Sequence, residues 1–197
     1  MENSLDQDLA VYKGILEKAF ASSDASVVPN SGPAHASAML STMFKHAQRN
    51  ICMVVGSFSN EVSGDKEYQS SFTNAVSKTD IITQVLVLDE PNESSVVYKL
   101  LVQLATNQPK RVSLRKATQA SIKSLVKELK TEEDGKPIHF AFFDNDVCRL
   151  EIDTKNFGAI GFIHDQKMVT RLQEIFAEAF EKGKPLAEAP KTTYAHA

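Results

Sequence analysis

One histidine, one arginine and one glutamate in the last third of the chain have the types and spacing for proton transfer or anion binding. His139 opens one apolar run, and Arg149 and Glu151 alternate with apolar residues in the next. An imidazole beside a carboxylate can relay a proton, and a nearby guanidinium can hold an anion. We therefore take these three as candidate catalytic residues. The alternative is a structural ion pair on the polar face of a hairpin.

The grouping of the three side chains depends on the register of that hairpin. Residues 144–146 read Asp-Asn-Asp, which is good turn chemistry. A three-residue loop would pair Phe143 with Val147, so that Ala141 would face Arg149 and the candidate residues would share one face. A shift of one residue would separate them. The opposite face would carry Phe140, Phe142, Cys148 and Leu150.

A second candidate site is the basic segment 110–130, where one acidic residue, Glu128, opposes seven cations. Those cations are Lys110, Arg111, Arg115, Lys116, Lys123, Lys127 and Lys130. Such a stripe can track the phosphates of a nucleic acid. The alternative is a solvated helix face. The segment lacks aromatic residues that could stack on bases, which argues against single-strand binding.

No metal site and no cofactor site is predicted. The acidic side chains of the hairpin, among them Asp144, Asp146 and Asp153, match no calcium-loop spacing. The segment 56–64 follows an apolar run and contains Ser57, but it lacks a phosphate-binding glycine fingerprint. We expect it to be a connection between a strand and a helix, with a ligand crevice as the alternative.

The composition is ordinary for a globular chain of 197 residues, with 42% hydrophobic and 24% charged residues. The formal net charge of −3 gives no global field toward nucleic acid or membrane. The acidic start excludes a secretory signal, and no apolar run is long enough for a membrane span. Cys52 and Cys148 lie in apolar runs and are expected to be buried thiols. We expect a cytoplasmic protein without a membrane partner.

Helical and strand patterns alternate through most of the chain, and these elements must position the candidate residues. The expected helices are 4–21, 36–48, 67–78, 94–107, 118–130 and 165–182, the last capped by Asp165. The expected strands are 51–58, 81–89, 111–116, 138–143, 147–152 and 159–164. This order predicts an α/β fold with a mixed, mainly parallel sheet and helices on both faces. We divide the chain into an N-terminal helix and loop (1–30), an α/β domain (31–182) and a disordered tail (183–197).

The layout of residues 36–181 resembles a half-domain of the phospholipase D-like superfamily. The family motif is His-x-Lys, four further residues and Asp; His139 and Asp146 match its ends, whereas Ala141 stands in place of the lysine. The closing segment "HDQKMVTRLQEIFAEAF" adds to the resemblance. In that family the histidine attacks phosphorus and the lysine binds phosphoryl oxygens, and two motifs make one site. A methyl group cannot supply the missing charge.

Three functions follow from these observations. The first is a catalytically degenerate protein that acts as a binding or assembly subunit, with a nucleic-acid context implied by the resemblance. The second is a homodimeric phosphodiesterase or nuclease in which Arg149 replaces the lysine beside His139. The third is a non-catalytic nucleic-acid-binding protein that uses the segment 110–130. Whether the chain is an enzyme stays open at this point, and the missing lysine favours the first function.

Overall fold

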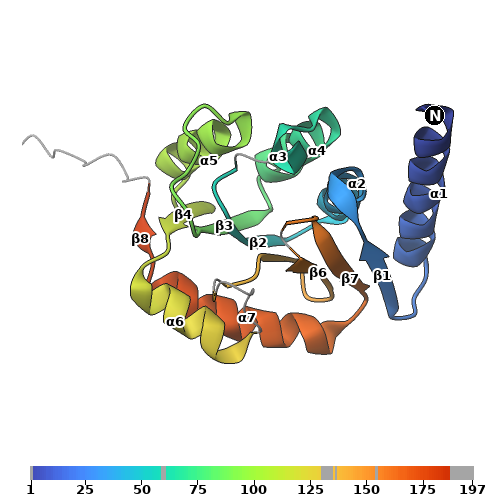
Figure 1. Ribbon diagram of the computed structural model, residues 1–197. Helices are drawn as coiled ribbons and strands as arrows, with labels where there is room; N and C mark the ends of the chain where they lie inside the picture. Colours follow the sequence, from blue (N-terminus) through green and yellow to red (C-terminus); the bar gives the residue numbers. More distant parts are fainter. Residues whose placement is uncertain (1, 59–60, 130–134, 136, 154, 187–197) are drawn as a thin grey trace, which may run out of the picture.

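The protein is an eight-stranded sheet between two layers of helices (Figure 1). The computed structural model describes residues 2–58, 61–129, 135, 137–153 and 155–186. The helices are α1 (Glu2–Ala21), α2 (Gly32–His46), α3 (Glu61–Gly64), α4 (Lys66–Ser77), α5 (Val96–Asn107), α6 (Gln119–Glu128) and α7 (Gln166–Glu181). The strands are β1 (Ser26–Asn30), β2 (Asn50–Val55), β3 (Ile82–Val87), β4 (Val112–Lys116), β5 (Phe140–Phe143), β6 (Val147–Asp153), β7 (Gly158–Ile163) and β8 (Lys184–Pro185).

The strands lie in the order β1-β7-β6-β5-β2-β3-β4-β8. Only β2, β3 and β4 are parallel to one another, and all other neighbours are antiparallel. The prediction of an α/β fold with a mixed sheet and helices on both faces is confirmed, but "mainly parallel" is wrong. Alternation of helices and strands implies parallel pairing only where a helix connects two neighbouring strands of the sheet. The later strands β5, β6 and β7 are instead joined by short turns, which force antiparallel neighbours.

Strand β1 lies in a segment that the sequence predicts to be loop. Its five residues pair with β7, from Ser26 opposite Ile163 to Asn30 opposite Ala159. Proline and serine are typical of turns, so their presence in this segment predicts a loop where the structure has a strand. Proline is tolerated at a sheet edge, and Pro29 removes a backbone donor from this edge strand. The sheet therefore extends beyond β7 to β1, a strand from the N-terminal region of the chain.

Two hydrophobic cores lie on the two faces of the sheet. Helices α2, α4 and α5 cover one face, where Phe44 packs edge-on against Phe72 and Phe143. Helices α6 and α7 cover the other, where Phe142 meets Phe176. Asp165 caps the start of α7, because its carboxylate accepts from the Met168 N–H at 2.9 Å, as predicted from its position.

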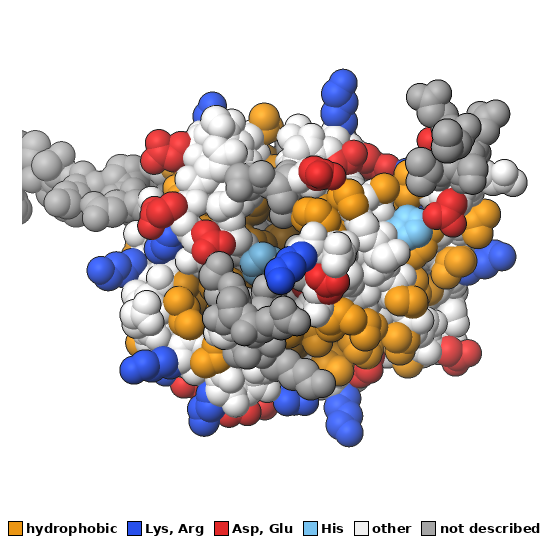
Figure 2. All heavy atoms as spheres, in the orientation of Figure 1, with side chains coloured by type: hydrophobic (Ala, Val, Ile, Leu, Met, Phe, Trp, Pro, Cys, Tyr) orange, Lys and Arg blue, Asp and Glu red, His pale blue; other side chains and the backbone are white. Residues whose placement is uncertain are grey.

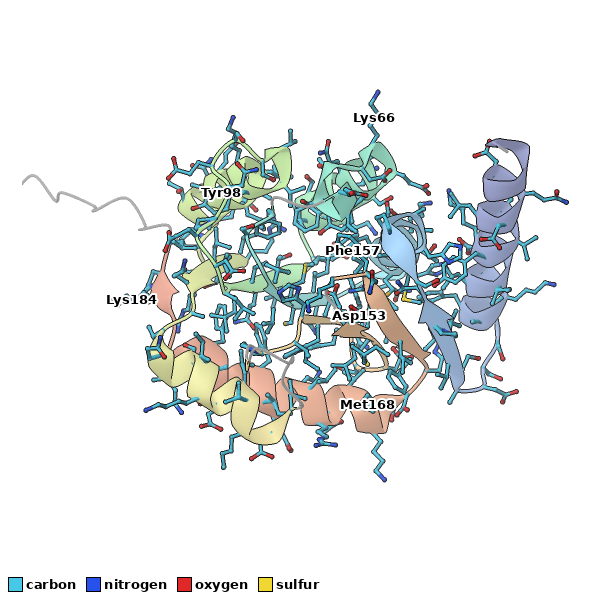
Figure 3. All side chains as sticks on the ribbon, in the orientation of Figure 1. Lys66, Tyr98, Asp153, Phe157, Met168 and Lys184 are labelled. Carbon is cyan, nitrogen blue, oxygen red and sulfur yellow. The ribbon has the colours of Figure 1, made fainter. Side chains whose placement is uncertain are left out.

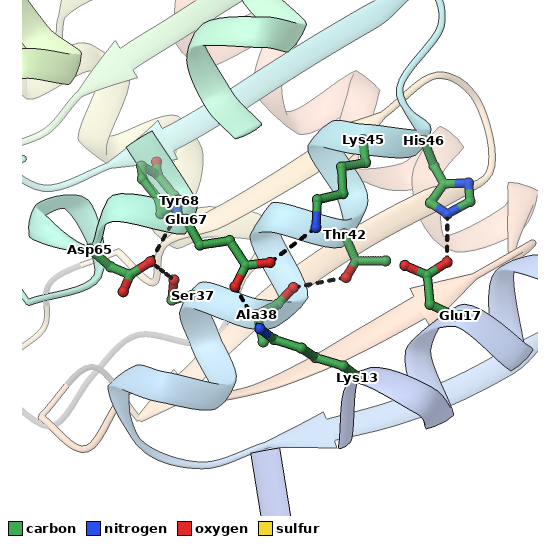
Figure 4. A network of polar contacts seen from close by, with 10 residues as sticks. All are labelled: Lys13, Glu17, Ser37, Ala38, Thr42, Lys45, His46, Asp65, Glu67 and Tyr68. Carbon is green, nitrogen blue, oxygen red and sulfur yellow. Dashed lines mark hydrogen bonds and ion pairs between the residues drawn. The ribbon is translucent and has the colours of Figure 1, made fainter. Parts of the chain in front are cut away.

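Helix α1 packs on the domain through α2 (Figure 4). The ring of Tyr12 stacks on His35 with centroids 4.1 Å apart, and the ring of Phe20 stacks on His46 at 4.2 Å. The carboxylate of Glu67 on α4 joins the two helices, because it accepts from Lys13 and Lys45 at 2.6 and 3.0 Å. These two hydrogen bonds lower the pKa of Glu67, Lys13 being the larger cause.

The first residues of the predicted disordered tail (183–197) include a short strand. Lys184 and Pro185 form β8 and pair with β4, while residues 187–197 of the predicted tail lie outside the described residues. Within the part of the chain that the structure describes, no helix is long and apolar enough to cross a membrane.

Candidate functional site

The hairpin has the register that its turn predicts. Phe143 pairs with Val147 and Ala141 with Arg149. The Glu151 N–H donates to the His139 carbonyl at 2.9 Å, which extends the pairing beyond the strand. The three candidate residues therefore share one face, and the opposite face packs against α7. The turn residue Asp144 adopts φ of 51°, a left-handed conformation that aspartate tolerates.

His139, Glu151 and Arg149 make direct contact. His139 Nδ1 lies 3.1 Å from Glu151 Oε2, and Arg149 Nη1 donates to the same oxygen at 3.5 Å. Because a carboxylate can only accept, His139 Nδ1 is the donor in this contact. The arrangement holds an imidazole in one tautomer, as a proton-transfer site or a nucleophilic site requires.

Arg149 is buried behind the histidine, with only 5% of its surface exposed. Its Nε donates to Asn30 Oδ1 at 3.3 Å, and its Nη2 donates to the Phe157 carbonyl at 3.4 Å. Phe157 lies in the turn between β6 and β7 (Figure 3). Burial lowers the pKa of the guanidinium, and the charge of Glu151 opposes this shift. All three nitrogens of Arg149 therefore already have acceptors within the protein.

Two buried tyrosines lie near the guanidinium. Burial raises the pKa of the Tyr12 and Tyr68 phenols, and the charge of Arg149 partly offsets this shift. Both rings are therefore neutral near pH 7. Tyr12 comes from α1, so the N-terminal helix contributes to the surroundings of the site.

A small pocket of about 60 Å³ opens beside His139 at the carboxyl end of β2. Gly56, just after β2, forms part of the lining. A Cβ placed on Gly56 would lie 3.4 Å from His139 Nε2 and 3.3 Å from Asp89 Oδ2. The rest of the lining is largely apolar and includes Leu40, Val55, Phe58, Val62, Tyr68, Ala141 and Phe157. The loop 56–64 thus borders the pocket, although Ser59 and Asn60 lie outside the described residues.

Sequence reasoning missed Asp89 and Asn30 as parts of this site. Asp89 follows β3, and a polar residue at the carboxyl end of a parallel strand is a usable signal for a site. Asn30 ends β1 and lies 119 residues from Arg149 along the chain, so their contact depends on the pairing of β1 with β7. No local pattern predicts that contact.

In the basic segment, the two arginines bind the protein's own backbone. Arg111 Nη1 donates to the carbonyl of Val76 at 2.6 Å and to that of Lys78 at 3.0 Å. Arg115 donates to the Phe180 carbonyl at 2.9 Å, and its guanidinium lies 4.7 Å from the centre of the Phe180 ring. Both groups join neighbouring elements and are largely withdrawn from solution.

Two of the described lysines of the segment lie beside acidic side chains. Lys116 pairs with Glu90 at 2.7 Å, and Lys127 lies 3.2 Å from Glu128. Lys110 and Lys123 are exposed, whereas Lys130 lies outside the described residues. Figure 2 shows basic and acidic side chains interspersed over this face of the molecule.

The acidic residues of the hairpin have structural roles. Both oxygens of Asp144 accept from consecutive backbone N–H groups, those of Gln48, Arg49 and Asn50, at 2.6 to 3.0 Å. Asp146 Oδ2 lies 2.8 Å from His164 Nδ1, and this hydrogen bond raises the pKa of His164. Among the described residues, no group of three or more His, Cys, Asp or Glu side chains could hold a metal ion.

The two cysteines are free and buried, as predicted. They lie on the face of the sheet that α7 covers. Burial raises the pKa of each thiol to about 12, so both are protonated at neutral pH. Neither is a candidate nucleophile.

Several solved structures share this fold at low sequence identity. Nuc, a phospholipase D family member from Salmonella typhimurium, is 13% identical with a TM-score of 0.58, over 84% of this chain and 100% of that one. TrmBL2, an archaeal chromatin protein whose structure shows a novel mode of DNA binding, is 14% identical with a TM-score of 0.54, over 93% and 66%. NucT from Helicobacter pylori is 11% identical with a TM-score of 0.50, over 82% and 99%. No protein-family model and no curated protein sequence matches the chain.

Proposed function

We propose that this chain, which has a phospholipase D-like fold, is a catalytically degenerate member of that superfamily and acts as a binding or assembly subunit. The observation that carries the proposal concerns the positively charged side chains near His139. The methyl group of Ala141 stands where the family motif has a lysine. The nearest guanidinium, that of Arg149, is buried and bonded to Glu151, Asn30 and Phe157.

Phosphoryl transfer needs donors directed at the oxygens on which negative charge develops. Here the histidine keeps its orienting carboxylate, whereas the one cation among the described residues that line the pocket, Arg149, is already bonded within the protein. Asp89 adds a negative charge next to Gly56, on the Nε2 side of the ring. A phosphodiester that approached Nε2 would therefore meet a carboxylate where it needs a cation.

The working context of the proposal is a nucleic-acid-related assembly in the cytoplasm. Its support is the fold shared with TrmBL2, an archaeal chromatin protein whose structure shows a novel mode of DNA binding. Exposed lysines such as Lys110 and Lys123 are compatible with a peripheral nucleic-acid contact. Self-association and a protein partner are both part of this proposal.

One observation favours a second candidate, a dimeric phosphodiesterase or nuclease. Arg149 pairs with Ala141 across the hairpin and also lines the pocket. A rearrangement that released Arg149 from Asn30 and Phe157 would place a guanidinium near Nε2. The second copy needed to complete a two-motif site would come from a homodimer.

The test separates the two candidates by activity. Wild-type protein and His139→Ala are incubated with bis(p-nitrophenyl) phosphate and with mixed DNA and RNA, and the mass in solution is measured by light scattering. The proposal expects no difference between the two proteins. Cleavage by the wild type that His139→Ala abolishes would establish the phosphodiesterase instead.

A further inference from the structure

The C-terminal end of helix α1 contacts a histidine that lies between two hydrogen-bond acceptors. His164 follows β7, and its Nδ1 lies 2.8 Å from Asp146 Oδ2, while its Nε2 lies 3.4 Å from the carbonyl oxygen of Phe20. Phe20 belongs to the last turn of α1, where carbonyl groups have no partner within the helix. The backbone of His164 has φ of 60°, a left-handed conformation that histidine tolerates. One imidazole therefore connects the turn between β5 and β6 with the end of α1.

The two acceptors make this contact depend on the charge of the ring. A carboxylate and a carbonyl oxygen can only accept hydrogen bonds. The charged imidazolium has two N–H donors and satisfies both, whereas the neutral ring has one N–H and turns a lone pair toward the other acceptor. Because Asp146 is charged, it is the stronger acceptor. The carbonyl of Phe20 is therefore the partner that loses its donor when the ring is neutral.

The surroundings of the ring favour its charged form. The hydrogen bond with Asp146 raises the pKa of His164, burial opposes this shift, and the contact with the Phe20 carbonyl adds to it. The C-terminal end of α1 carries partial negative charge, which also attracts a cation. Other charged or titratable side chains line the same pocket of about 290 Å³, namely Asp144, His46 and Arg49. Among the described lining residues, two carboxylates outnumber the single guanidinium, which favours a charged imidazole.

We propose that His164 makes the attachment of the C-terminal end of α1 sensitive to pH. The charged ring binds Asp146 and the Phe20 carbonyl together, and the neutral ring keeps Asp146 and releases the last turn of α1. The contact is fully formed below the ordinary histidine pKa of about 6.5 and is lost as pH rises through the raised pKa of His164. The same helix carries Tyr12, which lies near Arg149, so an opening that spread along α1 would reach the buried guanidinium.

The test measures hydrogen exchange of the amides in the last turn of α1 between pH 5.5 and pH 9, corrected for the intrinsic exchange rate at each pH. We expect the opening equilibrium of this turn to increase about fivefold over that range, the effect of one histidine charge at a helix C-terminus. The midpoint of the increase should coincide with the titration of the His164 Cε1–H resonance, assigned from its loss in His164→Asn. An opening equilibrium that stays constant, or a midpoint that differs from the titration, would overturn the inference.

Two histidine variants locate the effect. Asparagine tolerates the left-handed backbone and carries no charge, so in His164→Asn the last turn should open as readily at pH 5.5 as at pH 9. His35→Asn is the matched control, because His35 also contacts α1, but through Tyr12 and Asp8 in the first part of the helix. It should keep the fivefold change. A change retained in His164→Asn, or lost in His35→Asn, would contradict the role assigned to His164.

Asp146→Asn tests the direction of the effect. The substitution removes the carboxylate that is the largest cause of the raised pKa of His164, so the midpoints of both the opening and the titration should move to lower pH. Midpoints equal to those of the wild type would contradict the coupling. This variant also decides the inference if His164→Asn does not fold.

Discussion

At the scale of single residues, the pairing of Arg149 with Glu151 determines both the stability and the charge of the site. Arg149 is 5% exposed and Glu151 is 6% exposed. Removal of either side chain would leave the other as a buried charge without its partner. Removing one partner of a buried ion pair is far more costly than removing both. The site is therefore a structural element as well as a candidate binding site.

The first prediction follows from that burial. Arg149→Met should lower the free energy of unfolding by about 3 kcal/mol, because Glu151 would remain buried and charged. The double variant Arg149→Met/Glu151→Gln should recover part of the loss. The same change at the exposed Arg49 should cost less than about 0.5 kcal/mol. Urea unfolding of the variants gives the values, and equal losses at Arg149 and Arg49 would contradict the role assigned to Arg149.

The second prediction concerns pH. The hydrogen bond to Asp146 raises the pKa of His164, so the folded state favours the imidazolium more than the unfolded state does. This contribution is fully present below the ordinary histidine pKa of about 6.5 and is lost as pH rises through the raised pKa. The stability difference between wild type and Asp146→Asn should therefore be larger at pH 5.5 than at pH 9. A difference that does not change over this range would contradict the coupling.

At the scale of elements, α1 is held by a narrow buried stripe. Leu16 is fully buried, whereas its neighbour Ile15 is 48% exposed on the outer side of the helix. The two residues are equal in size and adjacent in sequence. They therefore form a matched pair for measuring how tightly α1 is docked.

The third prediction uses this pair. Leu16→Ala should cost about 2 to 5 kcal/mol of stability, and Ile15→Ala should cost about 1 kcal/mol or less. Hydrogen exchange of the α1 amides should be faster in Leu16→Ala and unchanged in Ile15→Ala. Only a short segment connects α1 to β1, so α1 can open locally when its buried contact is lost. Similar effects of the two substitutions would mean that α1 does not pack as described.

The elements also show what the sequence can predict and why. The hairpin register was predictable because a three-residue turn at 144–146 determines it locally. Strand β1 and the directions of the later strands were not, because they depend on pairings between distant segments such as Ser26 and Ile163. In the site, the contact of His139 with Glu151 follows from the register. The positions of Asn30 and Asp89 depend on how the whole sheet is assembled.

At the scale of the whole molecule, the distribution of charge argues against a strong nucleic-acid interface. The net charge is −3, and the arginines of the segment 110–130 bind backbone carbonyls. Among the described residues of this segment, exposed lysines such as Lys110 and Lys123 would offer only a few contacts to phosphates. Any direct contact with nucleic acid should therefore be weak.

The fourth prediction puts a magnitude on that contact. With about two phosphate contacts, affinity for a DNA duplex should fall about tenfold between 50 and 200 mM salt. Fluorescence anisotropy with a labelled duplex measures the slope, and Lys123→Gln should reduce it while Lys66→Gln, on the exposed start of α4, should not. A fall of a thousandfold or more would require six or more contacts and would contradict this account.

The central claim, that the His139 site has lost its phosphoryl chemistry, is tested most directly by the mass of the intact protein. Wild type and His139→Ala are incubated in excess over a phosphodiester and quenched, and each is weighed by mass spectrometry. The account predicts that both proteins keep their original mass and that the phosphodiester is recovered intact. A covalent phosphoryl adduct on the wild type that is absent from His139→Ala would contradict it.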